Sequence, residues 1–161
     1  MRYTNRVMLK RMYLIFIVIV IVIVIVGFAA WWLRGRSTPM QTATLTVGGH
    51  EFMVEVADTI PLRERGLSGR ENLEDGRGML FVFGAAGRHA FWMRGMKIPL
   101  DFIWIKDGRV VGVTENVPPP SGSLLSLPMY YPPSEADKVL EVAAGTVARV
   151  GVKVGDGVQS R

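Results

Sequence analysis

Residues 100–117 read LDFIWIKDGRVVGVTENV, and this stretch decides the fold class of the chain. Two runs rich in β-branched and aromatic residues flank Asp107-Gly108, a pair that is typical of a tight β-hairpin turn. Leu100, Phe102 and Trp104 would share one face of the first strand, opposite Ile103 and Ile105. Because apolar side chains occupy both faces, the hairpin predicts a sheet that is covered on both sides.

Further strands are expected on both sides of this hairpin, at residues 42–47, 51–56, 79–83, 89–93, 139–142 and 152–154. The first two flank Gly48-Gly49, which predicts a second hairpin. Helical turns are expected at residues 58–67, 135–137 and 145–150, and loops at residues 84–88 and 118–133. Many short strands with little helix predict an all-β domain, a small closed barrel or sandwich with one or two short helices.

A long apolar segment precedes this domain. Residues 14–33 contain 19 apolar residues and Gly27, and as a helix they would extend about 30 Å, the thickness of a bilayer core. Trp31 and Trp32 end the run, where indole rings favour a membrane interface. We expect a single N-terminal transmembrane helix that acts as an uncleaved signal anchor, since a small-x-small cleavage pattern is poorly formed.

The charge distribution predicts the orientation of that helix. The chain has a net charge of +5, but residues 1–39 hold six basic residues and no acidic one, and residues 40–161 hold 13 basic and 14 acidic residues. Four basic residues precede the apolar run, so the positive-inside rule places the N-terminus in the cytoplasm. The predicted parts are a basic cytoplasmic leader (1–13), a membrane anchor (14–33), a linker (34–40) and an extracytoplasmic β domain (41–158).

The composition excludes several classes of function. The chain has no Cys and two His, which excludes disulfide scaffolds, Cys nucleophiles and His-rich metal cages. A nearly neutral domain outside the cytoplasm is also not expected to bind nucleic acid. We expect no cofactor.

Seven short motifs occur in a characteristic order, at residues 64–70 (ERGLSGR), 78–83 (GMLFVF), 91–94 (FWMR), 100–103 (LDFI), 131–133 (YPP), 139–142 (VLEV) and 151–156 (GVKVGD). In this order and at these spacings the chain resembles the bacterial and archaeal family called domain of unknown function 192, over residues 41–158. The resemblance implies a small all-β domain, usually exported or membrane-anchored. It implies no activity.

Two acidic residues lie within apolar strands and are candidates for chemistry. Asp101 shares a strand face with Ile103 and Ile105, and Glu141 shares one with Val139. A carboxylate in such surroundings needs a hydrogen-bonded or cationic partner, for which Arg65, Arg70, Arg94 and Lys97 are candidates. Each acid is either a site residue or a buried structural group, and as a pair they could serve as the general acid and base of a hydrolase.

A second group of candidates is aromatic and basic. Trp92, near the end of the expected strand 89–93, and Arg94, just after it, alternate on one face, and Tyr131 lies in the proline-rich loop. With Arg65 and Arg70, such a surface suits saccharides or anionic polymers. The alternative is that Trp92 belongs to the core and that the arginines are solvated. His89, Met93 and Met96 offer imidazole and thioether groups that suit Cu(I), although Met in such strands is more often core filler.

From these patterns we expect a non-catalytic binding module at the cell envelope, with a saccharide or a protein as its ligand. The ligand-side residues would be Arg65, Arg70, Trp92, Arg94 and Tyr131, with Asp101 and Glu141 orienting the arginines. The alternatives are a hydrolase of an envelope polymer that uses Asp101 and Glu141, and a Cu(I) site.

Overall fold

The computed structural model of the chain describes residues 3–34, 40–121 and 127–161. The chain divides into two compact units, residues 1–39 and residues 40–161. The described part of the first unit is helix α1 (Tyr3–Arg34). Among the helices of the described residues, none has the combination of length and apolar character that crossing a membrane requires. Within the predicted linker, residues 35–39 lie outside the described residues.

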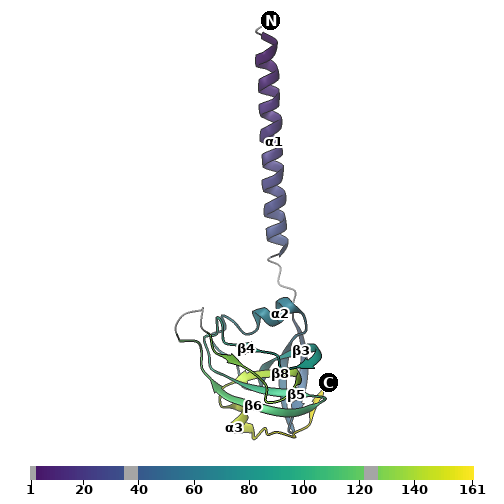
Figure 1. The fold of residues 1–161 in the computed structure, drawn as a ribbon, viewed down its shortest axis with the longest axis vertical. Coiled ribbons are helices and arrows are strands. Elements are labelled where there is room, and N and C mark those ends of the chain that lie inside the picture. The colour runs from purple at the N-terminus through teal and green to yellow at the C-terminus, as the bar shows by residue number, and fades with distance from the viewer. Residues whose placement is uncertain (1–2, 35–39, 122–126) are drawn as a thin grey trace. The chain divides into compact units, whose positions relative to one another are not determined.

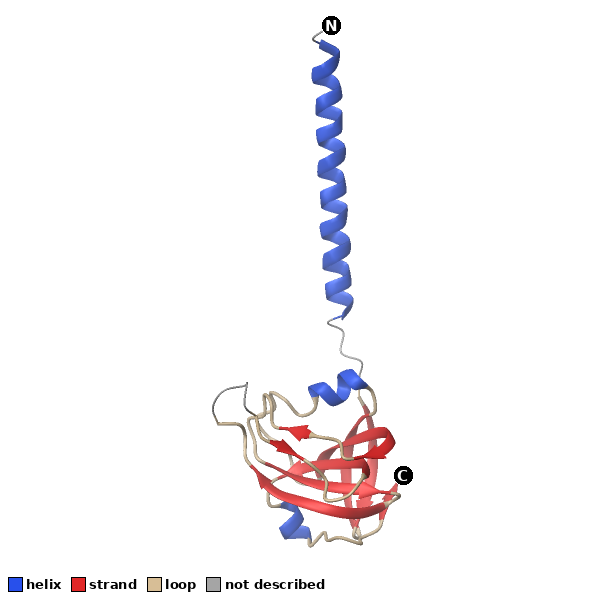
Figure 2. Ribbon diagram, viewed as in Figure 1, coloured by secondary structure: helices blue, strands red, loops and turns tan. Residues whose placement is uncertain are grey.

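The second unit consists mostly of β-structure, as the sequence predicted (Figure 2). Its elements are β1 (Gln41–Val47), β2 (His50–Ala57), α2 (Ile60–Arg65), β3 (Arg77–Gly87), β4 (Phe91–Trp92), β5 (Leu100–Lys106), β6 (Arg109–Val117), β7 (Met129–Tyr130), β8 (Ala136–Ala143), α3 (Thr146–Val150) and β9 (Val158–Ser160). Seven strands form one sheet in the order β6-β5-β8-β3-β2-β1-β9, and β4 pairs with β7 in a separate small sheet. The two hairpins expected around Gly48-Gly49 and Asp107-Gly108 are both present.

The seven-stranded sheet is strongly curled (Figure 1). At one end, the edge strand β6 meets the turn before β9, where Arg109 and Gly157 form a bridge. The Val110 N–H donates to the Asp156 carbonyl (2.9 Å), and the Gly155 N–H donates to the Val110 carbonyl (2.8 Å). A single curled sheet, a half-barrel with its edges linked at one point, therefore replaces the fully closed barrel or two-sheet sandwich that the sequence suggested.

The curl encloses one of two hydrophobic clusters, which we call the interior cluster. It draws residues from six strands and from the α3 region: Leu45, Val47, Phe52, Val54, Leu80, Ile103, Ile105, Val110, Leu140, Val142, Val147 and Val152. Ile103 and Ile105 of β5 belong to it, as the alternation along that strand predicted. Because strands from both ends of the sheet contribute, this cluster holds the curl closed.

The other face of the central strands is covered by a second cluster, which we call the outer cluster. Its buried members are Ala57, Leu67, Met79, Phe81, Phe91, Met93, Met96, Leu100, Phe102, Trp104, Val117, Ala136 and Val139. Part of its cover comes from the crossover that contains α2, because β2 and β3 are parallel and a parallel pair needs a long connection. Leu62 of α2 packs against this cluster, and the segment after β4 contributes Met93 and Met96. Coverage of both faces explains why the central strands are apolar on both sides.

Several local expectations were wrong. The helical turn expected at residues 135–137 is instead the start of β8, where Ala136 is buried against the outer cluster. The final strand lies at Val158–Ser160 rather than at residues 152–154, because the Val152 N–H donates to the Val147 carbonyl at the end of α3. The loop expected at residues 84–88 is largely part of β3, and the strand expected at residues 89–93 is reduced to Phe91–Trp92.

Asp101 is a structural residue at one end of the half-barrel. Its side chain is fully buried on the interior face of β5. Its two carboxylate oxygens accept hydrogen bonds from the backbone N–H groups of Asn116 (2.8 Å) and Val147 (2.9 Å). The carboxylate thus joins β5 to the end of β6 and to α3. The expectation of an arginine or lysine partner was wrong, because backbone amides satisfy this carboxylate.

We predict that Asp101→Ala lowers the free energy of unfolding of the domain. The change leaves two backbone N–H groups without their acceptor, which costs roughly 2–4 kcal/mol for buried, charge-assisted hydrogen bonds. Urea denaturation of residues 40–161, which form a compact unit containing both clusters, measures the loss. Glu115→Ala is the control, since Glu115 lies exposed near the end of the neighbouring strand. Equal stability of the two variants would contradict the structural role.

Candidate functional site

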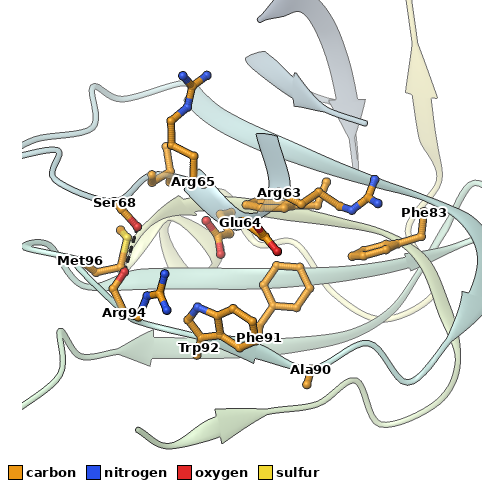
Figure 3. Close-up of a pocket in the computed structure, with 14 residues that line it drawn as sticks. Arg63, Glu64, Arg65, Ser68, Phe83, Ala90, Phe91, Trp92, Arg94 and Met96 are labelled. Atoms are coloured by element: carbon orange, nitrogen blue, oxygen red, sulfur yellow. Dashed lines mark hydrogen bonds between the residues drawn. The ribbon is translucent and has the colours of Figure 1, made fainter. Parts of the chain in front are cut away.

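A pocket of about 170 Å³ opens on the outer face of the sheet (Figure 3). Its lining comes from the end of α2 and the following turn, from β3, from the segment around β4, and from β8: Arg63, Glu64, Arg65, Gly66, Leu67, Ser68, Phe81, Phe83, Ala90, Phe91, Trp92, Arg94, Met96 and Glu141. The cavity lies where the cover of the outer cluster is incomplete.

Glu141 contributes a buried carboxyl group to this pocket. Alternation along β8 places Leu140 and Val142 in the interior cluster, and Glu141 on the opposite face with Val139, as predicted. The residue is 5% exposed, and its carboxyl group accepts no hydrogen bond and forms no ion pair with any described residue. Burial raises the pKa of this carboxyl group to about 8. Near neutral pH the group is therefore mostly protonated, and it can donate a hydrogen bond.

Two guanidinium groups at the pocket have no hydrogen-bond or ion-pair partner among the described residues. Arg65 ends α2, Arg94 follows β4, and both are exposed. No ion pair or side-chain hydrogen bond joins either guanidinium to the described part of the protein. In Figure 3, Arg94 lies beside Trp92, whereas the guanidinium of Arg65 points away from the pocket. Arg94 is thus the better placed of the two to meet a ligand.

Arg63 also lines the pocket but has a structural role. Its guanidinium donates to the carbonyls of Asp58 (2.6 Å) and Val82 (2.8 Å) and lies 5.2 Å from the ring centre of Phe83. These contacts hold α2 against β3. Because its Nη1 group donates both hydrogen bonds and the guanidinium lies near the Phe83 ring, Arg63 is held in the wall of the pocket.

Aromatic side chains form one side of the pocket. The rings of Phe81 and Phe91 meet edge to face with their centres 5.0 Å apart, and Phe91 also contacts Trp104 at 5.4 Å. Trp92 adjoins this buried group but remains 41% exposed. The buried rings fix the backbone of β4 and leave the Trp92 indole available at the opening.

Two hydrogen bonds connect the halves of the pocket. The Ser68 hydroxyl donates to the Arg94 carbonyl (2.8 Å), which Figure 3 marks, and the Gly69 N–H donates to the Gly95 carbonyl (2.8 Å). They fix the turn after α2 to the turn after β4. These two contacts set the backbone around Arg65 and the backbone around Arg94 relative to each other.

The structure brings together four of the seven candidate site residues: Arg65, Trp92, Arg94 and Glu141. Arg70 does not line the pocket, because it forms a two-point ion pair with Glu55 (2.7 Å for both contacts) that holds the pKa of Glu55 below its usual value. Tyr131 is half exposed beyond β7 and does not line it either. Asp101 lies on the other face of the sheet.

The acid–base pair of the hydrolase hypothesis is not formed. Strands β5 and β8 are neighbours, but Asp101 is paired with Val142 and Glu141 with Phe102. Paired residues share a face and successive residues alternate, so the two acids point to opposite sides of the sheet. One substrate cannot meet both carboxyl groups.

The residues of the Cu(I) hypothesis have structural contacts. Met93 and Met96 are buried in the outer cluster. The His89 ring stacks on Phe83 with centres 3.8 Å apart, and its Nε2 lies 3.0 Å from the Ala85 carbonyl. Within the described residues, no group of three or more His, Asp or Glu side chains is arranged to hold a metal ion.

Sequence reasoning missed most of the pocket wall. Glu64, Ser68, Phe83 and Met96 line it and were not expected as ligand-side residues. Gly66 and Ser68 in the first family motif gave a weak signal of a functional turn. No pattern in the sequence revealed that the crossover between parallel strands would place this turn beside residues 90–96.

Comparison with known proteins identifies the family of this domain. The family model for DUF192, described as "Uncharacterized ACR", matches residues 43–160. The chain belongs to the DUF192 family. This confirms the resemblance seen in the seven motifs.

Two solved structures have the same fold as this DUF192 domain. A crystal structure of a putative transcription regulator from Sinorhizobium meliloti 1021 is 31% identical, with a TM-score of 0.70, and the match covers 77% of this chain and 97% of that chain. A protein of unknown function from Novosphingobium aromaticivorans DSM 12444 is 32% identical, with a TM-score of 0.69, and the match covers 77% of this chain and 89% of that chain. The search of curated proteins finds no match.

The raised pKa of Glu141 predicts a specific dependence of stability on pH. In the unfolded chain this carboxyl group has its ordinary pKa of 4.5 and loses its proton above that pH, whereas the folded protein keeps the proton up to about pH 8. The free energy of unfolding therefore falls as the pH rises from 4.5 to about 8. Over this range the wild type should lose roughly 1 kcal/mol of stability per pH unit through Glu141, and Glu141→Gln, which has no proton to release, should not show this loss.

Urea denaturation at about pH 5 and about pH 9 measures this effect. Glu64→Gln is the control, because Glu64 lines the same pocket but is exposed. Parallel pH dependences of the wild type and Glu141→Gln would show that the buried carboxyl group ionises normally.

Proposed function

We propose that residues 40–161 form a non-catalytic binding module of the cell envelope, with the pocket above Glu141 as its ligand site. The ligand would be a component of the envelope, part of a saccharide or of a protein. Trp92 and Arg94 would contact it directly, and Glu141 would meet the part that enters the pocket.

One observation carries this proposal: Glu141 is a buried carboxyl group with no partner in the described protein, and it faces a cavity. The 5% exposure of Glu141 means that its carboxyl group is largely removed from water, which costs free energy, and a packed apolar residue in its place would avoid that cost. The arrangement becomes favourable when a ligand supplies the missing hydrogen bond. The nearby Arg94 guanidinium is likewise without a partner among the described residues.

The same surroundings favour binding over catalysis. Acid–base chemistry needs a second positioned group, and Asp101 faces away from the pocket. The Ser68 hydroxyl donates to the Arg94 carbonyl, and no His is among the lining residues that would activate it.

We further propose that the N-terminal segment anchors the domain to the cytoplasmic membrane, with the domain outside. The support is in the sequence: 19 apolar residues within residues 14–33, four basic residues before them, and a nearly neutral domain after them. In addition, the apolar side chains of residues 14–26 in α1 are exposed in the structure. An apolar surface of this size is unfavourable in water, and a lipid bilayer would cover it.

The charge of this domain does not fit DNA binding of the kind that the name of the Sinorhizobium meliloti relative, a putative transcription regulator, suggests. DNA-binding domains concentrate positive charge, whereas residues 40–161 hold 13 basic and 14 acidic residues. The pocket is also too small to accommodate a duplex.

We predict that soluble peptidoglycan fragments change the NMR signal of Trp92 in ¹⁵N-labelled residues 40–161. Trp92 and Trp104 are the two tryptophans of this unit, so two indole N–H signals are expected. The Trp92 signal should shift because its ring borders the pocket. The Trp104 signal is an internal reference, since its N–H is buried and donates to Thr114 (2.9 Å).

The matched variant for this titration is Arg94→Ala, which should weaken the shift, with Arg70→Ala as the control outside the pocket. If the fragments leave the Trp92 signal unchanged at saturating concentration, peptidoglycan is not the ligand of this pocket.

We predict that the full-length protein sediments with membranes and that removal of residues 1–36 releases it. A C-terminal tag should be digested by protease added to spheroplasts, since the domain would lie outside. A soluble product that begins near Trp31 would instead indicate a cleaved signal peptide, and a protected tag would indicate the opposite orientation.

A further inference from the structure

The polar groups of the pocket are distributed unevenly between its opening and its interior. At the opening, the charged side chains are Arg65, Arg94 and Glu64, all exposed, and the guanidinium of Arg65 points away from the pocket (Figure 3). Arg94 is the cation that Figure 3 places beside Trp92. A guanidinium presents several N–H donors in one plane and is suited to a carboxylate or a phosphate.

The walls between the opening and the interior are apolar. Leu67, Phe81, Phe91 and Met96 are all buried members of the outer cluster. The polar groups that border them are engaged: Ser68 donates to the Arg94 carbonyl, and Arg63 donates to two carbonyls. A ligand segment at this depth would therefore find apolar contacts and few free hydrogen-bonding groups.

Among the described buried side chains that line the pocket, the carboxyl group of Glu141 is the polar group without a hydrogen-bond or ion-pair partner. It is 5% exposed, and burial keeps it protonated near neutral pH. A carboxylic acid that an apolar site keeps neutral acts as a hydrogen-bond donor. The charged residues around it are Arg63, Glu64 and Arg65 from the α2 region and Arg94 after β4, whereas β3 presents Phe81 and Phe83.

We propose that the pocket binds a small organic anion with an apolar arm, whose carboxylate or phosphate pairs with Arg94 and whose far end accepts a hydrogen bond from Glu141. This inference rests on the proposed binding function and names the chemical class of the ligand. The volume of about 170 Å³ is below the roughly 300–1,000 Å³ of ordinary ligand pockets, so one ring or a short chain would fill it.

Two other ligand classes fit less well. A sugar ring would bring several hydroxyl groups into the apolar walls, and each one without a partner costs free energy. An amine would meet the unpaired guanidinium of Arg94 at the opening and would have to ionise Glu141. A carboxylate with a flat apolar arm meets neither difficulty.

Three related probes separate these features, and isothermal titration calorimetry on residues 40–161 measures their affinities. The first is 4-hydroxyphenylacetate, which has the anion, the ring and a distal hydroxyl group. Phenylacetate lacks the hydroxyl group, and tyramine replaces the carboxylate with an amine. We expect 4-hydroxyphenylacetate to bind more tightly than either by roughly tenfold, the effect of one charge-assisted or buried hydrogen bond.

Variants assign the two ends of the ligand. Arg94→Ala should abolish the preference for 4-hydroxyphenylacetate over tyramine, whereas Arg65→Ala is the matched control, because its guanidinium points away from the pocket (Figure 3). Glu141→Ala should abolish the preference for 4-hydroxyphenylacetate over phenylacetate, and Glu141→Gln, which keeps a donor, should retain it. Circular dichroism of each variant verifies that it is folded.

The outcomes distinguish this inference from the proposed function. If peptidoglycan fragments shift the Trp92 signal but the three probes do not bind, or if tyramine binds as tightly as 4-hydroxyphenylacetate, the ligand class is wrong and the binding module stands. If neither fragments nor probes bind, both are wrong. Displacement of bound 4-hydroxyphenylacetate by the fragments would identify an end group of the envelope polymer as the source, and no displacement would identify a free acid.

Discussion

The structure of this domain depends on one constraint: the central strands β3, β5 and β8 are apolar on both faces, so neither face of the sheet can remain in water. Curling buries one face in the interior cluster, with Asp101 joining β5 to β6 and α3 at the end of the curl. The other face needs a separate cover, which the α2 crossover and the segment after β4 provide. The pocket exists because this second cover is made of two segments that meet incompletely over β8.

The two buried acids show how neighbouring positions acquire different roles. Asp101 and Glu141 lie on adjacent strands within one residue of register, yet alternation places them on opposite faces. The carboxylate of Asp101 is satisfied by two backbone amides and stabilises the fold. Glu141 receives no such contact from the described residues, and its raised pKa expresses the cost of keeping it there. A buried group that destabilises the free protein is the strongest indication of a ligand site in this chain.

The arginines in and near the pocket also have different roles, some structural and one free to meet a ligand. Arg63 and Arg70 are engaged by carbonyl groups and by Glu55, and they fix α2 and the following turn to the sheet. Arg94 has no such contact with the described residues and lies beside the half-exposed Trp92. Membership in the DUF192 family and the fold of the two solved relatives establish the architecture, whereas the proposed ligand is inferred from these unpaired groups.

The sequence alone determined the local features that depend on neighbouring residues. Alternation and turn residues predicted both hairpins, the helical turn at α2 and the burial of both faces of residues 100–105, because side-chain direction along a strand follows a period of two. The order of seven motifs identified the family, and four of the seven residues proposed for the ligand site do line one pocket. Tertiary structure decided the rest. The parallel pairing of β2 with β3 brings residues 63–68 beside residues 90–96, and no local pattern encodes such a long-range contact. It also decided which acid is satisfied and which is free, since that depends on the backbone amides that the curl of the sheet brings to each carboxyl group.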